Sequence, residues 1–379
     1  MKILVTGANG FVGKNISQTL KNIKEGKDST HNLFIEDIFL FDINSSMSDL
    51  ERYTVDCDFI INLAGINRPK NSLEFYEGNK GFLETLCSYL VANNNKCPII
   101  ASSSIHVGKN NDYAKSKKAG EDYLLKFSEE NGNPIYIYRF ANLFGKWCKP
   151  NYNSVVATWC YNIAHHLDIQ ISDPSVVLSL CYIDDVINEL ISCIEGHPNQ
   201  TGSYCSVSPI YKVSLEHLNS ILQNIKNSRE NLSIIDQSDE FTKKLYATYL
   251  SYLPEEEFSY NLKMNIDNRG SFSEFIRTQE HGQVSINISK PGIIKGNHWH
   301  HTKNEKFLVV CGTGVIRLRK INEKKIIEYH VSGEKMKVVD IPTGYTHNIE
   351  NLGETDMVTV MWANEPFNPN KPDTYFEEV

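Results

Sequence analysis

KILVTGANGFVGKN, residues 2–15, joins an apolar run typical of a buried strand to glycines in the spacing GxxGxxG, at Gly7, Gly10 and Gly13. Glycine permits a tight turn and lets backbone N–H groups approach a pyrophosphate at the positive end of the helix that follows. The order of strand, glycine loop and helix separates a phosphate-binding loop from a chance match. We therefore predict that the chain begins with a dinucleotide-binding fold.

Short apolar runs and amphipathic stretches alternate through the rest of the first half. The strand-like runs lie at 38–42, 58–65, 98–104 and 134–140, and helix-like segments lie at 81–93 and 113–129. This alternation predicts an α/β fold with a Rossmann-type, doubly wound parallel sheet.

The pattern changes near Phe258, where many short β-rich runs separated by Gly, Asn and Asp turns begin. Such runs predict an antiparallel all-β sandwich or barrel. A chain of 379 residues also exceeds the size at which single cores stop growing. We expect a nucleotide-binding domain at 1–245, a linker at 246–257 and an all-β domain at 258–379.

Composition narrows the classes of partner. The formal net charge of −8 argues against nucleic acid and anionic membranes, because both require a basic face. No apolar run approaches the roughly 18 residues that span a bilayer, and no leader is visible before the first strand, so we expect a cytoplasmic protein. Nine cysteines without a CxxC pair favour reduced thiols in that compartment.

A candidate catalytic set follows the fourth predicted strand. Ser102–Ser104 end this strand, and Tyr113 and Lys117 follow in YxxxK spacing. Residues four apart share a helix face, so we expect the Lys117 ammonium to lower the pKa of the Tyr113 phenol. Such a phenol protonates a carbonyl oxygen as hydride reaches the carbonyl carbon, while a serine hydroxyl holds that oxygen.

With these motifs, residues 1 to about 245 resemble the extended short-chain dehydrogenases/reductases that act on nucleotide sugars. By position, the resemblance implies that Ser104 is the catalytic serine, with Ser103 a close second. It makes Asn79 a structural or catalytic residue, and RFANLFG at 139–145 implicates Asn142 in substrate binding. Arg139 is either a structural ion-pair partner or a substrate contact.

The resemblance also implies a nicotinamide cofactor. Asp42 ends the second strand, where an acid accepts hydrogen bonds from a free ribose and so favours NAD, although an ordinary loop acid or N-cap explains it equally well. Close relatives are associated with NADPH, so we expect NADPH and leave NADH open. NLAG at 62–65 matches the segment that lies along the cofactor. The cofactor residues implied are Gly7, Gly10, Phe11, Val12, Gly13, Asp42, Leu63, Ala64, Gly65 and Lys117.

The all-β half contains a candidate metal site. His298, His300 and Glu305 follow Gly292 in the pattern G-x5-H-x-H-x4-E-x6-G, and His347 lies in P-x-G-x2-H-x3-N. His298 and His300 point to the same side of a strand, because the side-chain period is two. Three imidazoles and a carboxylate suit a divalent metal such as zinc, or equally Fe, Mn or Ni. The two blocks resemble the paired motifs of the cupin superfamily, with Met336 where a turn glycine is expected.

The strand before these motifs carries D-x-R-G-x-F-x-E at 267–274. It resembles the entry strand of the dTDP-4-keto-6-deoxyhexose 3,5-epimerases, which implies that Arg269 binds a diphosphate; a surface ion pair with Glu274 is the alternative. An epimerase of this kind needs a base, for which His300, His347 and Tyr345 remain equal candidates. We expect His301, on the opposite side of the strand, to be structural.

Taken as a whole, the chain resembles the family of bifunctional capsular polysaccharide synthesis enzymes, in which an extended short-chain dehydrogenase/reductase is fused to a cupin. The resemblance rests also on GKWCKPNYNSV (145–155), TYLSYLP (248–254) and PDTYF (372–376), and it is weakest at 21–58. It implies a homodimer formed through the cupin.

The family's substrate is a UDP-linked 4-keto-6-deoxy-N-acetylhexosamine, a UDP-2-acetamido-2,6-dideoxy-4-hexulose. The resemblance implies that the cupin inverts C3 and that the reductase then reduces the C4 ketone to UDP-N-acetyl-6-deoxy-L-talosamine, on the route to UDP-N-acetyl-L-fucosamine. One alternative is a monofunctional reductase whose cupin serves only dimerisation or metal-dependent stability. Another is a non-enzymatic sensor that binds cofactor and nucleotide sugar.

Overall fold

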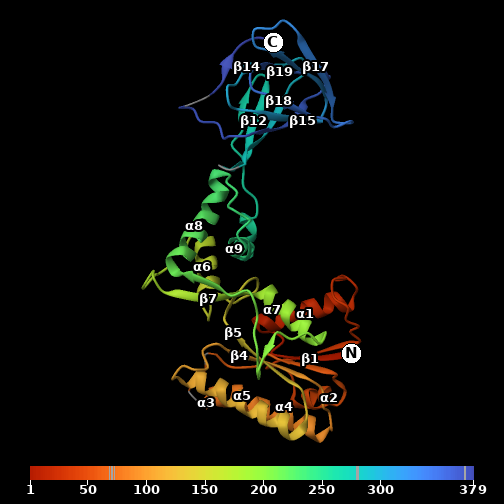
Figure 1. Ribbon diagram of the computed structural model, residues 1–379, viewed down its shortest axis with the longest axis vertical. Helices are drawn as coiled ribbons and strands as arrows, with labels where there is room; N and C mark the ends of the chain where they lie inside the picture. Colours follow the sequence, from red (N-terminus) through yellow and green to blue (C-terminus); the bar gives the residue numbers. More distant parts are fainter. Residues whose placement is uncertain (68, 70, 72, 279–280, 371–372) are drawn as a thin grey trace. The chain divides into compact units, whose positions relative to one another are not determined.

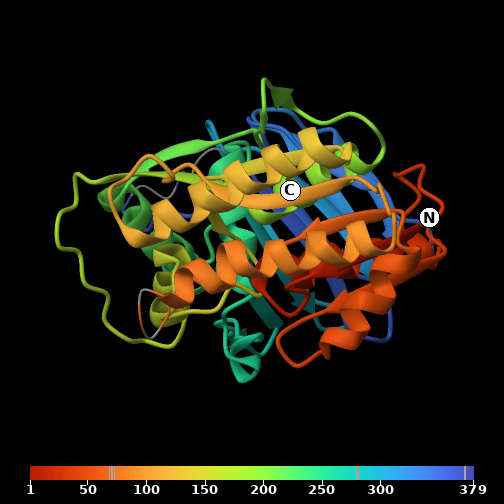
Figure 2. The ribbon, with the colours of Figure 1, turned by 90° about the horizontal axis from the view of Figure 1, so that it is seen from below.

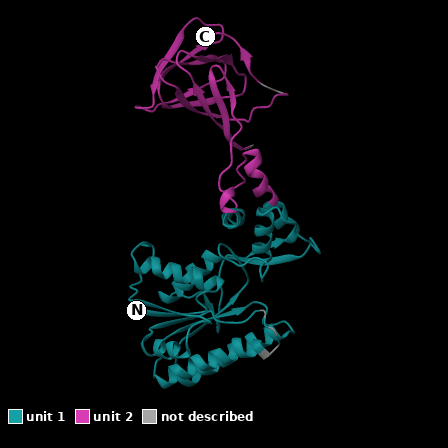
Figure 3. Cartoon of the chain, turned by 180° about the vertical axis from the view of Figure 1, so that it is seen from behind, with its two compact units in different colours: residues 1–222, 240–253 teal, residues 223–239, 254–379 magenta. Residues whose placement is uncertain are grey.

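The computed structural model describes residues 1–67, 69, 71, 73–278, 281–370 and 373–379. The chain divides into two compact units (Figure 3). Unit 1 comprises residues 1–222 and 240–253, and unit 2 comprises residues 223–239 and 254–379.

The centre of unit 1 is a seven-stranded sheet in the order β2-β1-β3-β4-β5-β9-β8 (Figure 1). Its neighbouring strands are parallel, except that β8 and β9 are antiparallel. The predicted Rossmann-type sheet is therefore confirmed. The strands are β1 (Lys2–Thr6), β2 (Asp37–Phe41), β3 (Phe59–Asn62), β4 (Ile99–Ser104), β5 (Ile135–Phe140), β8 (Gln200–Thr201) and β9 (Tyr204–Cys205).

Helices cover both faces of this sheet (Figures 1 and 2). Alternate residues of β1 belong to different cores: Ile3 and Val5 pack with α1 and α7, whereas Leu4 packs with α2, α4 and α5. Because both faces are buried, the strands read as continuous apolar runs. The helices are α1 (Phe11–Lys24), α7 (Ile183–Ile194), α2 (Met47–Asp56), α4 (Phe82–Ala92) and α5 (Asp112–Asn131).

Smaller elements complete this part of the chain. A three-stranded sheet has the order β10-β7-β6, and β6 follows directly on the last long strand of the main sheet. The elements are β6 (Asn142–Phe144), β7 (Val177–Tyr182), β10 (Tyr211–Ser214), α3 (Leu73–Tyr76), the π-helical turn η1 (Glu77–Gly81), α6 (Val155–Ala164), α9 (Glu240–Leu250) and the first part of α8 (Leu215–Asn231). The rest of α8, from Gln223, and the 3-10 turn η2 (Glu255–Glu257) belong to unit 2. No helix among the described residues is long and apolar enough to cross a membrane.

Unit 2 consists mainly of two antiparallel sheets, in the orders β11-β12-β13-β20-β15-β18 and β17-β16-β19-β14-β21. Inward side chains from both sheets, such as Phe307, Ile316 and Ile349, form its apolar core. The predicted all-β cupin fold is confirmed. The strands are β11 (Asn265–Asp267), β12 (Gly270–Thr278), β13 (Gly282–Ser289), β14 (Ile294–Trp299), β15 (Glu305–Cys311), β16 (Thr313–Lys320), β17 (Ile326–Ser332), β18 (Val338–Ile341), β19 (Tyr345–Asn351), β20 (Met357–Ala363) and β21 (Tyr375–Phe376).

Candidate active sites in the two units

In the glycine loop of unit 1, Gly7 and Gly13 have no room for a side chain. Gly7 has φ +68°, and a Cβ on Gly13 would lie 2.1 Å from the Gly7 carbonyl oxygen. Gly10 is the N-cap of α1 and no side chain caps this helix, whose first turn begins at Phe11 and Val12. The N–H groups of an uncapped helix N-terminus suit a pyrophosphate. The residues present therefore fit a dinucleotide.

The loop after β3 lies directly against this turn. β3 is shorter than predicted and ends at Asn62, so Leu63, Ala64 and Gly65 leave the sheet. A Cβ on Gly7 would lie 2.8 Å from the Ala64 nitrogen. The structure thus brings the two predicted cofactor segments together at the carboxyl edge of the sheet.

Asp42 follows β2 and joins the glycine loop. Its carboxylate accepts hydrogen bonds from the backbone N–H of Asn9 at 2.7 Å and of Ile43 at 2.8 Å. The loop-acid alternative describes these contacts, and one carboxylate can accept further bonds from a ribose. Its contact with the cofactor remains a prediction.

The structure distinguishes the two candidate serines at the end of β4. Ser103 donates a hydrogen bond of 2.6 Å to the buried carboxylate of Glu121, so its hydroxyl is engaged inside the protein. Ser104 interacts with the Tyr113 hydroxyl instead. Neighbouring residues of a strand point to opposite faces, which explains why only one of the two reaches the tyrosine.

The Tyr113 phenol and the Lys117 ammonium differ from the sequence-based expectation. Burial raises the pKa of Tyr113, and the hydrogen bond with Ser104 opposes this only in part. Burial and Ser104 account for the pKa of Tyr113, so the predicted lowering of this pKa by Lys117 is absent. The Lys117 ammonium instead donates to the Ser102 carbonyl at 3.3 Å. Burial lowers the pKa of Lys117 itself to about 8, while the negative charge of Glu121 acts in the opposite direction.

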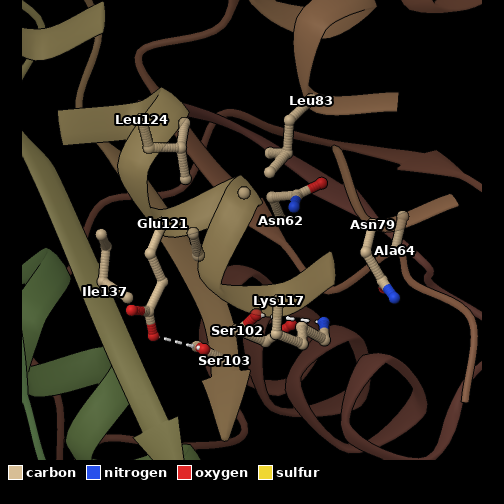
Figure 4. Close-up of a pocket in the computed structure, with 12 residues that line it drawn as sticks. Asn62, Ala64, Asn79, Leu83, Ser102, Ser103, Lys117, Glu121, Leu124 and Ile137 are labelled. Carbon is tan, nitrogen blue, oxygen red and sulfur yellow. Dashed lines mark hydrogen bonds between the residues drawn. The ribbon is translucent and has the colours of Figure 1, made fainter. Parts of the chain in front are cut away.

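A small cavity of about 10 Å³ lies behind Lys117, lined by polar groups that include Asn62, Ser102 and Glu121 (Figure 4). This is space for about one water molecule. Glu121 also accepts two hydrogen bonds from Arg139, at 2.9 and 2.6 Å. The structure therefore favours the ion-pair alternative for Arg139. Sequence reasoning missed Glu121, although its position four residues after Lys117 on α5 was a signal.

The two candidate asparagines have different surroundings. Asn79 is buried in η1, where its amide bonds both backbone groups of Ile66 and the Ser116 hydroxyl, each at 3.0 to 3.1 Å. These contacts hold the loop after β3, which is a structural role. Asn142 is exposed on β6 and donates to the Ser179 carbonyl at 3.2 Å. Its contact with substrate remains a prediction.

In unit 2, the four predicted metal ligands meet. One ligand atom from each of His298, His300, Glu305 and His347 lies within 4.8 Å of those from the other three. The first two come from β14 and the loop after it, and the others from β15 and β19. Both ring nitrogens of His347, Nε2 of His300 and Oε2 of Glu305 are buried without a hydrogen-bond partner. Buried polar atoms are rarely left so, and this donor set fits a divalent metal.

The charges in this cluster suit a cation. Burial lowers the pKa of His298 to about 4, so its ring is neutral at neutral pH, the form that binds a metal. Burial acts to raise the pKa of Glu305, but His300 and His347, whose Nε2 atoms lie 3.6 and 3.2 Å from its carboxylate, lower it. Glu305 is therefore an anion among imidazoles.

A cavity of about 450 Å³ opens over the cluster, and Arg269 lies on its wall. This volume is typical of small-molecule sites. Arg269 pairs with Asp267 at 2.6 Å, and Glu274 pairs with Arg277, so the alternative of an Arg269–Glu274 pair is wrong. Arg269 lies in the tight turn between β11 and β12, which brings its side chain back to Asp267, two residues earlier.

Lys295 lies on the same wall and was missed by sequence reasoning. Its ammonium donates to the Asn287 side chain and the Ile288 carbonyl, each at 2.8 Å, and burial lowers its pKa. The sequence signal that could have found Lys295 is its position three residues before the predicted ligand His298. Of the three candidate bases, only His347 is among the described residues that line the cavity. Tyr345 packs against the apolar core instead.

Comparison with known proteins identifies the class. Residues 3–203 match the NAD dependent epimerase/dehydratase family, and residues 265–375 match the polysaccharide biosynthesis C-terminal domain. The chain belongs to this epimerase/dehydratase family and carries that C-terminal domain.

Particular relatives match over the whole chain. A crystal structure of the capsular polysaccharide assembling protein CapF from Staphylococcus aureus is 52% identical with a TM-score of 0.93, and the match covers 100% of both chains. The UDP-2-acetamido-2,6-beta-L-arabino-hexul-4-ose reductase of Pseudomonas aeruginosa is 40% identical over 99% of this chain and 98% of its own. These matches confirm the predicted resemblance to the capsular polysaccharide enzymes of the CapF type.

A more distant structure shares the fold alone. The UDP-glucuronic acid 4-epimerase of Bacillus cereus is 19% identical with a TM-score of 0.54, over 66% of this chain and 98% of its own.

Proposed function

We propose that this chain is a bifunctional nucleotide-sugar enzyme of UDP-N-acetyl-L-fucosamine biosynthesis. Unit 2 would epimerise C3 of a UDP-2-acetamido-2,6-dideoxy-4-hexulose, and unit 1 would reduce its C4 ketone to UDP-N-acetyl-6-deoxy-L-talosamine. The observation that carries the proposal is the presence of two separate polar sites in one chain: Ser104, Tyr113 and Lys117 at the cofactor edge of a parallel sheet, and four metal-type donors in a cavity of about 450 Å³. The names of the full-length relatives support the substrate class.

The reductase site supplies a proton and a hydrogen bond to one oxygen. Bound NADPH, or NADH, would supply hydride to C4. Tyr113 then donates its proton to the C4 oxygen, and its raised pKa keeps the phenol protonated at neutral pH. Ser104 holds the same oxygen, and Lys117, which donates to the Ser102 carbonyl, is the third catalytic residue and would also bind the cofactor. We assign Asn142 to substrate binding.

The epimerase site must pass the C3 proton to a base, for which His300, His347 and Tyr345 are the candidates, stabilise an enolate at the C4 oxygen, and return a proton to the opposite face of C3. Two cationic side chains, Arg269 and Lys295, are among the described residues that line the cavity. Arg269 is paired with Asp267, whereas Lys295 belongs neither to this pair nor to the donor cluster. Its bonds to two acceptors favour the ammonium, so we assign it to the enolate oxygen. The four donors His298, His300, Glu305 and His347 would hold a divalent metal, for which zinc is our first candidate, and the metal would supply Lewis acidity. Arg269 would contact the diphosphate.

The ketone dictates the order of the two steps. The C4 carbonyl makes the C3 proton acidic and is also the hydride acceptor, so epimerisation must precede reduction. Joining both sites in one chain raises the local concentration of the keto sugar. We further propose a cytoplasmic homodimer formed through the cupin, with domain limits at 1–245 and 258–379.

The test follows C3 and C4 by NMR. Purified protein is incubated in D2O with the UDP-4-keto-6-deoxy-N-acetylhexosamine, first without cofactor and then with NADPH or NADH. We expect deuterium at C3 before cofactor is added and a 4-hydroxy product afterwards. Reduction with hydrogen retained at C3 would favour the alternative, in which the cupin serves only dimerisation or metal-dependent stability. No turnover under any condition would favour the sensor.

A further inference from the structure

The C-terminal segment Asp373–Phe376 makes contacts that the proposed reaction does not use. Its strand β21 pairs with β14, so that Phe376 lies beside His298 and Tyr375 beside Trp299. Tyr375 and Phe376 of the motif PDTYF thus pair with the strand that carries His298 and leads into His300. Pro372 of the motif lies outside the described residues. His301, predicted to be structural, packs its ring edge-on against Trp299 and Tyr375.

Asp373 binds the loop that follows this strand. Its carboxylate accepts hydrogen bonds from three consecutive backbone N–H groups, those of His301 at 3.0 Å, Thr302 at 2.8 Å and Lys303 at 3.0 Å. The Thr302 hydroxyl adds a fourth at 2.8 Å. Burial acts to raise the pKa of Asp373, but these donors outweigh it and lower the pKa. The carboxylate is therefore an anion that fixes the loop between His300 and Glu305.

The backbone of the same residue contacts a candidate ligand directly. His300 Nδ1 lies 2.5 Å from the Asp373 carbonyl oxygen. A carbonyl oxygen only accepts, so Nδ1 carries the hydrogen and Nε2 carries the lone pair in the neutral ring. Nε2 is the buried nitrogen without a hydrogen-bond partner, 3.6 Å from Glu305. A carbonyl in this position selects the tautomer that binds a metal and orients the ring.

We infer that Asp373–Phe376 is a clasp that presets the metal site, with Asp373 as a positioning residue. The Asp373 carboxylate holds the loop after β14, and the Asp373 carbonyl holds the His300 ring. A single residue near the C-terminus therefore fixes a candidate ligand that lies more than seventy positions earlier in the sequence. The inference rests on the proposed metal site of unit 2 and extends it beyond the ligands.

The test is Asp373→Asn in the full-length protein. Either orientation of the new amide places an NH₂ group against at least one of the three backbone N–H groups, so the loop must move while the side-chain volume is kept. Zn²⁺ affinity is measured by competition with a chromophoric chelator, and the d–d spectrum of the Co²⁺-loaded protein reports the ligand geometry. The exposed Asp356→Asn, in the same unit, is the matched control.

We expect Asp373→Asn to lose about tenfold to a hundredfold in Zn²⁺ affinity, with an altered Co²⁺ spectrum, and Asp356→Asn to match wild type. Wild-type affinity and spectrum in Asp373→Asn would overturn the clasp. If Asp373→Asn does not fold, Thr302→Ala removes one of the carboxylate's donors, and a smaller loss of affinity is expected; an unchanged affinity there would also overturn it. His298→Ala separates the two proposals: if this variant keeps wild-type affinity, the metal site itself is wrong.

Discussion

At the scale of single residues, Tyr113 is the group whose loss should separate the two activities. Its hydroxyl interacts with Ser104, and burial raises its pKa. We predict that Tyr113→Phe slows C4 reduction by about 10²–10⁴-fold, because phenylalanine has no proton to donate. Deuterium exchange at C3 should be unchanged, since the exchange site is in unit 2. Cofactor oxidation and NMR in D2O measure the two rates.

Tyr123→Phe is the matched control for this experiment. Tyr123 lies on the same helix, α5, and also has a raised pKa, caused first by burial. Its variant should reduce C4 at the wild-type rate. Equal loss of reduction and exchange in Tyr113→Phe would contradict two independent sites.

Lys117 predicts a pH dependence of the reduction step. Burial lowers its pKa to about 8, so the ammonium is present below about pH 8 and is lost as the pH rises through that value. If reduction requires this positive charge beside the cofactor site, kcat/KM for reduction is constant below pH 8 and falls above it. The same shift makes the free energy of unfolding rise with pH from about 8 towards 10.5, because only the unfolded chain binds the proton there.

Lys117→Arg tests the assignment of this alkaline decline. A guanidinium keeps its charge throughout the range, so the decline should move to higher pH in the variant. A wild-type profile without a decline near pH 8, or an unchanged decline in an active Lys117→Arg, would show that another group titrates.

At the scale of elements, the turn between β1 and α1 requires glycine, because its backbone leaves no room for a side chain at Gly13. A Cβ on Gly13 would lie 2.1 Å from the Gly7 carbonyl oxygen, which belongs to rigid backbone. We predict that Gly13→Ala displaces the start of α1 and weakens NADPH binding at least tenfold, measured by titration calorimetry. Gly108→Ala is the control, because a Cβ there meets nothing within 4 Å. Wild-type affinity in Gly13→Ala would contradict a cofactor role for this turn.

Much of this architecture was predictable because local sequence dictates it. Strands buried on both faces must be apolar throughout, so β1, β4 and β5 were found within a residue or two of their ends. β3 was predicted too long, because NLAG continues the apolar run after the chain has left the sheet. The period of two predicted His298 and His300 on one side of a strand; the strand ends between them, at Trp299, but both side chains reach the same cluster.

Sequence reasoning missed contacts between residues far apart in the sequence and contacts that depend on the direction in which a side chain points. Ser103 and Ser104 are identical in type, and only their surroundings show that one bonds Glu121. Arg269 could have paired with either of two nearby acids, and the geometry of its turn decided for Asp267. No local pattern indicates that Asp373 returns to the loop after β14.

At the scale of the whole molecule, the proposed function has two units that act on one substrate by different mechanisms. The cofactor site lies within residues 1–222 and 240–253, and the donor cluster lies within residues 254–379. A change confined to one site should therefore spare the other activity. The position of the linker, predicted at 246–257, remains a prediction.

Metal removal is the strongest test of this separation. Nε2 of His300, both ring nitrogens of His347 and Oε2 of Glu305 are buried without a hydrogen-bond partner and would take up water or protons without the metal. We therefore predict that dialysis against a chelator lowers the Tm of unit 2 and slows C3 exchange at least tenfold. NADPH affinity should not change, because no residue of the glycine loop belongs to the cluster. Added Zn²⁺ should restore exchange, and His298→Ala should resemble the chelated protein and ignore added metal. A metal-free wild-type protein with full exchange would contradict a catalytic metal, and it would leave Lys295 as the main group that stabilises the enolate.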